Sequence, residues 1–286
     1  MRAPHVSRLA AAFGCAAALI SYGCSNSLTS QLPSQAAAGA RVHPNQLLLW
    51  YNGGRVLTAP KLYLVFWGYK KYGDPNKVQS LLESYAKNVG GSAHNDIYTQ
   101  YYETVKKKNV YITNPKDQYG GTWSDESAVP TSPTDQQVAA EAVKALAHLK
   151  YDPEGVYLIA TPHGRATQGF PTNWCAYHSY TTYQKNNPVQ YINFPYTPDS
   201  DGCGKNSIKP PSDESGADEG VTIMAGDEYG EATTDPQPYS GWRGVDGEIG
   251  DDCAWHNLAN DRFGSKHYTT QPELSDATHT CVQSLK

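Results

Sequence analysis

The stretch LYLVFW at residues 62–67 decides the fold, because every position in it is apolar or aromatic. A strand that is apolar on both faces is typical of a sheet covered on both sides, as in α/β proteins with parallel strands. A second run of this kind, VYLIA, lies at residues 156–160. The two strands predict a single α/β domain with a mostly parallel or mixed sheet flanked by helices.

Apolar residues at helical spacing predict three helices around these strands. The first begins at Asp74-Pro75 and ends before Gly90-Gly91, the second begins at Asn95, and the third follows a capping box at residues 132–135. Helices placed between buried strands in this way fit the α/β class.

The two ends of the domain show weaker patterns. An Asn-Gly-Gly turn at residues 52–54 predicts a hairpin that joins 47–51 to 55–58. From His256 onward the chain has little periodic apolarity, which predicts an irregular cover over the domain.

The N-terminus has the pattern of an export signal. Residues 1–23 carry two arginines and then an apolar run that is too short to cross a bilayer, as in a signal peptide. Gly23-Cys24 resembles a bacterial lipoprotein cleavage site, although Ser21 stands where leucine is usual, so lipidation of Cys24 and ordinary signal cleavage are both open. Residues 24–44 predict a flexible tether, and residues 45–286 predict one globular domain.

The chain is acidic, with 28 Asp and Glu residues against 23 Lys and Arg and a formal net charge of −5. Loss of residues 1–23 would remove two arginines and make the charge more negative. Nothing basic remains to hold nucleic acid, so nucleic acid is not an expected partner. We expect a monomer that is exported as a periplasmic or outer-membrane lipoprotein or is secreted, with membrane attachment only through the lipid anchor.

Four cysteines remain beyond the predicted export signal and Cys24. An even number in an exported chain predicts two disulfides. The pairs Cys175–Cys203 and Cys253–Cys281 are favoured because each closes a short local loop. The alternative, a zinc–thiolate site, has no closely spaced cysteine pair to support it.

The densest chemistry lies in GVTIMAGDEYGEATTDPQPYSGWRGVDGEIGDDCAW at residues 220–255. Helical spacing places Asp227 and Glu231 on one face with Glu228 beside them, and like charges at that spacing cost an isolated helix about 0.2–0.5 kcal/mol. Further carboxylates follow in the same stretch, at Asp235, Glu248 and Asp251. Carboxylates gathered this densely repel one another, hold protons, or share a metal ion.

The spacing of Asp227, Glu228 and Glu231 matches that of helical zinc-peptidase motifs, in which residues i and i+4 bind the metal and a glutamate at i+1 polarises the attacking water. We therefore assign Asp227, Glu231 and the downstream acids as candidate metal ligands and Glu228 as the candidate catalytic base. An all-oxygen ligand set suits calcium, magnesium or manganese better than zinc.

Two histidines are candidate accessory residues. His163 follows the strand at residues 156–160, and the ends of buried strands are where open α/β sheets expose functional groups. His178 lies three residues from Cys175, whose disulfide would fix its position. The alternative for each histidine is a structural hydrogen bond.

The acidic stretch resembles the signature of the exordium or phosphate-induced-protein family of plants and its secreted bacterial and fungal relatives. The match consists of DEYGEATTDP at residues 227–236, Gly241-Trp242, and Glu248-Ile249-Gly250-Asp251-x-Cys253. Residues 51–54, 66–68, 156–158 and 175–178 also match, so the resemblance covers most of the mature chain. In the relatives the first motif commonly reads His-Glu-x-x-Glu-Ala-x-Thr-Asp-Pro, a zincin-like pattern that is altered here to Asp-Glu-x-x-Glu.

The resemblance implies an extracellular protein, and the plant members are linked with growth and cell-wall expansion. Position by position, Asp227 takes the place of the usual histidine, Glu228 that of the candidate base and Glu231 that of the second ligand. Asp235, Glu248 and Asp251 match the trailing acids. The motif itself predicts a zincin-like site with a divalent cation, zinc, calcium or manganese, and the aspartate at 227 weakens the expectation of zinc.

Three functional hypotheses follow. The first is an envelope-attached, metal-assisted hydrolase that acts on peptides or cell-envelope polymers. The second is a non-catalytic extracellular or cell-wall-associated binding protein whose carboxylates hold a structural cation or form a degenerate site. The third is that the acids lie on a solvated helix end, where they have no function beyond solubility and capping.

Overall fold

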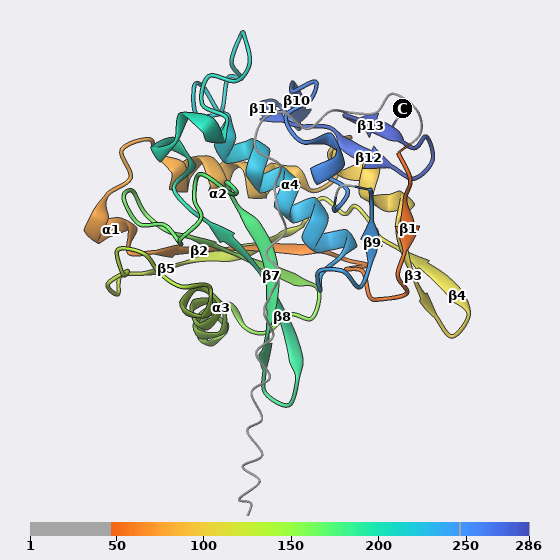
Figure 1. Ribbon diagram of the computed structural model, residues 1–286. Helices are drawn as coiled ribbons and strands as arrows, with labels where there is room; N and C mark the ends of the chain where they lie inside the picture. The colour runs from red at the N-terminus through yellow and green to blue at the C-terminus, as the bar shows by residue number, and fades with distance from the viewer. Residues whose placement is uncertain (1–46, 246, 286) are drawn as a thin grey trace, which may run out of the picture. The chain divides into compact units, whose positions relative to one another are not determined.

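The computed structural model describes residues 47–245 and 247–285. A five-stranded mixed sheet forms its centre (Figure 1). The strands lie in the order β5 (Tyr119–Asp125), β2 (Lys61–Trp67), β6 (Gly155–Ala160), β8 (Asn187–Phe194) and β7 (Tyr177–Tyr183). The first four are parallel and β7 is antiparallel to β8, so the predicted mixed sheet of an α/β domain is confirmed.

The two apolar stretches are the two central strands of this sheet. β2 pairs with β6 in parallel, with Leu64 opposite Leu158, and each strand is buried between neighbours on both sides. Alternate residues of β2 enter different cores: Leu64 and Phe66 face one layer of helices, whereas Val65 faces the other. The requirement for apolar residues on both faces follows from this double cover.

Helices cover both faces of the sheet. α2 (Val78–Val89) and α4 (Gly220–Thr234) share a core with one face, and α3 (Asp135–Leu149) shares a core with the other. α2 begins at Val78, later than the predicted start at Asp74-Pro75, and the Asp74 carboxylate accepts hydrogen bonds from the N–H groups of Val78 and Gln79 in its first turn. The remaining helical segments are α1 (Tyr69–Tyr72) and the 3₁₀ turns η1 (Asn95–Gln100), η2 (Thr197–Asp199), η3 (Asp201–Cys203) and η4 (Asp251–Cys253).

A capping box is present before the third helix, but it lies two residues later than the predicted one at residues 132–135. The Thr134 hydroxyl accepts the N–H of Gln137, and the Gln137 side chain accepts the N–H of Thr134. This reciprocal pair satisfies two backbone donors at the start of α3.

α4 differs from the other helices because all of its 15 residues are buried. It packs against α2 and β7 and against β11 of a C-terminal hairpin (Figure 1). A helix that is covered on every side needs partners for every polar group it carries. The acidic helix therefore lies inside the protein.

Antiparallel pairs of short strands extend the domain. They are β1 (Trp50–Tyr51) with β9 (Trp242–Arg243), β3 (Tyr102–Val105) with β4 (Lys108–Tyr111), β10 (Ala259–Phe263) with β11 (Lys266–Thr270), and β12 (Glu273–Ser275) with β13 (Thr280–Val282). The irregular cover predicted after His256 is therefore wrong, since two hairpins form there.

The hairpin predicted over residues 47–58 is also wrong. β1 pairs with β9, and the N–H of Gly54 donates to the carbonyl of Ser240 at 2.7 Å. Leu57 is fully buried, and its N–H donates to the carbonyl of Thr233 at the end of α4. Pairing with the segment after α4 satisfies these backbone groups and buries the apolar residues, which a local hairpin would not.

Both predicted disulfides are present. Cys175 joins Cys203 and Cys253 joins Cys281, each across a sequence separation of 28 residues. The second bond fastens η4 to the strand β13. The predicted signal peptide, the tether and Cys24 lie outside the described residues.

Candidate metal centre

His178 reaches the middle of the protein from β7. Its neighbour Tyr177 hydrogen-bonds Asp135 at the start of α3, so alternation along the strand turns His178 to the opposite face, toward α4. The imidazole is fully buried. Its Nε2 lies 3.0 Å from the backbone carbonyl oxygen of Asp235.

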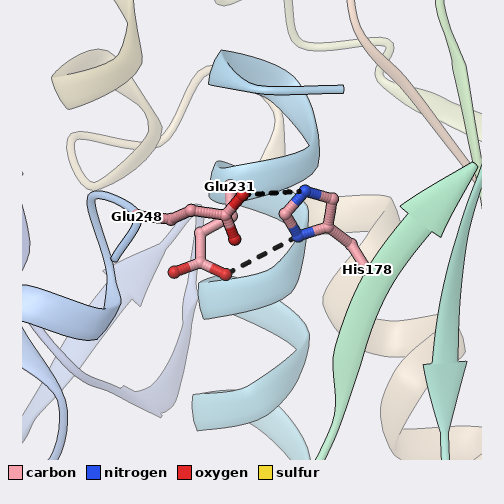
Figure 2. Close-up of side chains that lie close together, drawn as sticks. All are labelled: His178, Glu231 and Glu248. Atoms are coloured by element: carbon pink, nitrogen blue, oxygen red, sulfur yellow. Dashed lines mark ion pairs between the residues drawn. The ribbon is translucent and has the colours of Figure 1, made fainter. Parts of the chain in front are cut away.

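The other nitrogen of His178 faces carboxylates. Nδ1 lies 3.6 Å from Oε2 of Glu228 and 3.7 Å from Oε2 of Glu231, and it has no hydrogen-bond partner. Figure 2 shows the ring beside Glu231 and Glu248, and the distance from its Nε2 to Oε1 of Glu248 is 3.4 Å. If Nε2 donates its proton to the carbonyl of Asp235, the lone pair of a neutral ring points from Nδ1 at the two carboxylates of α4.

Six acidic side chains lie around this histidine on α4, on the loop before η4, on η4 itself and on β12. Each of them is 6% exposed or less. The carboxylate–histidine cluster consists of His178, Asp227, Glu228, Glu231, Glu248, Asp251 and Glu273. In the described part of the chain, no lysine or arginine forms an ion pair with Glu231, Glu248, Asp251 or Glu273.

Glycine allows the backbone before η4 to lie against the acids of α4. A Cβ atom on Gly250 would overlap Oδ1 of Asp227 and would lie 3.0 Å from Oε1 of Glu231. The next residue, Asp251, donates its N–H to Oε1 of Glu231 at 3.1 Å, and its Oδ1 has no hydrogen-bond partner. The loop thus supplies both a backbone donor and a further carboxylate to the cluster.

No sequence motif marks Glu273, a member of the cluster, or Gln271, which hydrogen-bonds to it. Glu273 is fully buried and neither of its carboxylate oxygens has a hydrogen-bond partner. Gln271 donates from Nε2 to Oδ1 of Asp227 at 2.8 Å and to the carbonyl of Gly250 at 3.2 Å. The Cys253–Cys281 disulfide is the one clue in the sequence that the C-terminal segment lies beside the acidic loop.

Burial and mutual repulsion change the protonation of the cluster. Burial raises the pKa values of Asp227, Asp251 and Glu273 well above the usual range, and the charge of Glu231 raises them further. Burial would lower the pKa of His178, but the negative charges of Glu248 and Glu231 raise it well above its ordinary value. In the absence of another cation, protons and an imidazolium must therefore neutralise the cluster.

The carboxyl group of Glu228 behaves differently. Burial raises its pKa to about 7, although the positive charge of nearby His178 opposes this shift. A carboxyl group that titrates near neutral pH is suited to proton transfer.

The donor atoms of the cluster are spaced as ligands of a cation would be. Two sets, His178 with Glu231 and Glu248, and Asp227 with Glu228 and Glu231, each offer one ligand atom per residue within 4.8 Å of one another. Ligand atoms about 2.1 Å from one ion lie roughly 3–3.5 Å apart. Nδ1 of His178 lies 3.6 and 3.7 Å from the oxygens of Glu228 and Glu231, slightly beyond this spacing and longer than an ordinary hydrogen bond. The oxygen of Glu248 lies 3.4 Å from the other ring nitrogen, Nε2.

Two candidates from the sequence have other partners. The carboxylate of Asp235 accepts the N–H groups of Tyr239, Ser240 and Gly241, so Asp235 closes the turn after α4 and presents its carbonyl, not its carboxylate, to His178. His163 is half-exposed at the end of β6, and its Nδ1 lies 2.5 Å from Asp199. His163 is thus held by Asp199, whereas His178 belongs to the cluster.

Comparison with protein families places this geometry in a known group. The family model described as the conserved region of phosphate-induced protein 1 matches residues 49–274. The chain belongs to the phosphate-induced protein 1 family. The matched region of this family member contains every residue of the carboxylate–histidine cluster, and membership confirms the resemblance to the exordium family.

Family membership and the two disulfides of this phosphate-induced protein 1 relative are compatible with an extracellular protein. Among the residues that the structure describes, no helix is long and apolar enough to cross a membrane. No curated protein and no solved structure matches the chain.

Proposed function

We propose that this phosphate-induced protein 1 relative is an extracellular protein whose carboxylate–histidine cluster binds a divalent cation. The observation that carries the proposal is the buried His178. Its Nδ1 has no hydrogen-bond partner and lies 3.6–3.7 Å from two carboxylates. An unpartnered buried nitrogen is costly, and coordination of a cation removes that cost.

The charge of the cluster supports the same function. Glu248 and Glu273 are buried, and none of their four carboxylate oxygens has a hydrogen-bond partner. A buried carboxylate without a partner either binds a proton or coordinates a metal ion. Divalent calcium or manganese prefers such oxygen ligands, and manganese and zinc also accept the imidazole.

Burial favours a structural cation over a catalytic one. The residues of the cluster are 6% exposed or less, whereas a catalytic metal keeps one coordination position open to water and substrate. We therefore propose a non-catalytic binding protein of the cell exterior, with the cation tying α4 to the C-terminal hairpins.

The second candidate function is a metal-assisted hydrolase of peptides or cell-envelope polymers. It is favoured by Glu228, which follows one α4 ligand directly, lies three residues before the other, and has a pKa of about 7. In this function Glu228 would polarise the attacking water. If the protein binds metal but hydrolyses neither casein nor glycans in a Glu228-dependent way, the hydrolase function is excluded and only the structural role of the cation remains.

The test is metal analysis of the purified protein and of its Glu231→Gln variant. We expect a stoichiometric divalent cation in the wild type, and loss of most of that cation in Glu231→Gln, because Glu231 belongs to both ligand sets. Glu141→Gln is the matched control, since Glu141 is a buried glutamate on α3 that pairs with Lys144 away from the cluster. A wild-type protein that binds no divalent cation during dialysis against manganese or calcium would overturn the proposal.

A further inference from the structure

The two ligand sets of the cluster share one residue, Glu231. The inference drawn from this sharing rests on the proposed function and concerns the number of ions and their ligands. One set contains the nitrogen of His178, and the other contains only carboxylates. A single ion would use one set and leave the other without a cation.

The two oxygens of Glu231 face in different directions. Oε2 lies 3.7 Å from Nδ1 of His178. Oε1 accepts the N–H of Asp251 at 3.1 Å and lies near Gly250, beside Oδ1 of Asp227. A carboxylate placed in this way can give one oxygen to each of two ions, which is how carboxylates bridge metal pairs about 3.5–4 Å apart.

The surroundings of the two sets differ in chemistry. At the His178 set, the hydrogen bond from Nε2 to the carbonyl of Asp235 orients the ring and its tautomer. At the other set, Gln271 donates to Oδ1 of Asp227 and so holds that carboxylate in place. Each set therefore has a supporting residue that is not itself a ligand.

The charge of the cluster also exceeds what one ion neutralises. Its six carboxylates carry up to six negative charges, and one divalent cation offsets only two of them. Two divalent cations offset four of these charges.

We propose that the cluster binds two divalent cations bridged by Glu231. The first ion takes His178, Glu231 and Glu248, a mixed nitrogen and oxygen set that suits manganese or zinc. The second ion takes Asp227, Glu228 and Glu231, an all-oxygen set that suits manganese, magnesium or calcium. Manganese fits both sets and is the probe of choice.

The experiment titrates metal-free protein with Mn²⁺ and follows both calorimetric stoichiometry and the electron paramagnetic resonance spectrum. We expect two equivalents to bind and an exchange-coupled spectrum, because a bridging carboxylate couples the two spins. His178→Ala should lose one equivalent and give the six-line spectrum of an isolated ion. Asp227→Asn should do the same from the other set, and Glu141→Gln should keep both ions.

The outcomes separate this inference from the proposed function. No binding by folded wild-type protein overturns both. One equivalent with a six-line spectrum overturns the paired site and leaves the proposed function standing. Two uncoupled ions overturn the assignment of Glu231 as the bridge, and two ions retained in His178→Ala overturn the assignment of His178 as a ligand of the first ion. Circular dichroism of each metal-free variant shows that loss of an ion does not reflect unfolding, and His178→Gln replaces His178→Ala if the latter does not fold.

Discussion

A proton and a cation compete for His178. Without metal, the pKa of His178 is raised well above its ordinary value: burial alone would lower it, but the negative charges of Glu248 and Glu231 outweigh that effect. The ring is then an imidazolium at neutral pH and acts as an internal counter-ion for the carboxylates. Coordination through Nδ1 needs the neutral ring, so a cation must displace this proton.

The competition predicts proton release when the metal binds. At pH 7 we expect Mn²⁺ binding to release at least one proton, because His178 and the carboxyl groups with raised pKa values are protonated beforehand. Calorimetric titrations in buffers of different ionisation enthalpy measure this number. His178→Ala should release about one proton fewer, and an equal release from both proteins would contradict the protonated state of His178.

Gly250 sets how closely the loop before η4 approaches α4. Gly250→Ala places a Cβ atom onto Oδ1 of Asp227, so the loop or the carboxylate must move. We expect a loss of about 1–3 kcal/mol of stability, typical of overpacking, and at least a tenfold weaker Mn²⁺ affinity. Thermal unfolding and calorimetry measure the two effects.

Gly202→Ala is the matched control for this substitution. Its new Cβ would meet only Oγ of Ser200, at an ordinary contact distance of 3.5 Å. This variant should keep the affinity of the wild type. If the two glycine variants bind Mn²⁺ equally well, close approach at residue 250 does not shape the site.

Among the helices and strands, the sequence predicted those whose structure is decided by local rules. Apolar runs on both faces identified β2 and β6, and a capping-box pattern located the start of α3 to within two residues. The pairing of β1 with β9 could not be foreseen, because it joins segments about 190 residues apart whose backbone groups have no local partner.

The same distinction explains the outcome for the candidate site. The spacing of Asp227, Glu228 and Glu231 on one helix is local and readable from the sequence. Glu273 lies in a three-residue strand within a polar segment, and only tertiary packing carries it to α4. Whether His163 or His178 would join the cluster depended on which strand turned its side chain toward α4, which periodicity alone did not decide.

The Cys253–Cys281 disulfide holds η4 and the C-terminal hairpin together beside the cluster. Replacing both cysteines with serine should cost about 3–4 kcal/mol, the chain-entropy value for a loop of this length, and should lower Tm by roughly 7–14 °C. It should also weaken Mn²⁺ binding, because Asp251 belongs to the same 3₁₀ turn as Cys253.

The other disulfide gives a matched comparison. Cys175–Cys203 spans the same 28 residues, so its removal should destabilise the protein by a similar amount. Neither of its cysteines lies in η4, so the Mn²⁺ affinity of the folded Cys175/Cys203 variant should fall less than that of the Cys253/Cys281 variant. An unchanged Tm in the Cys253/Cys281 double variant would argue against a stabilising role for that bond.

On the scale of the whole molecule, the cluster links parts of the fold that are distant in sequence. His178 comes from the sheet, Asp227 and Glu231 come from the buried helix α4, and Glu273 comes from a C-terminal hairpin. Repulsion among these carboxylates pushes apart the same elements whose apolar side chains form the core. The stability of the fold therefore depends on what neutralises the cluster.

This dependence predicts that pH acts in opposite directions on the metal-free and metal-loaded protein. In the metal-free protein the cluster carboxyl groups and His178 have raised pKa values. A raised pKa in the folded state gives stability that is complete below the unfolded value, about 4 for the acids, and is lost as pH rises through the folded value. For Glu228 that loss begins near the unfolded value and is complete near pH 7.

We therefore expect the Tm of protein in EDTA to fall by at least about 5 °C between pH 5 and pH 8. In excess Mn²⁺ the Tm should rise over the same range, because deprotonated ligands bind the cation more tightly and binding stabilises the folded state. Glu273→Gln should flatten the decline in EDTA, since it removes one carboxyl group that must otherwise ionise inside the protein. A Tm in EDTA that rises with pH would mean that the buried carboxylates are already neutralised by a partner within the chain, and the case for a cation would then fail.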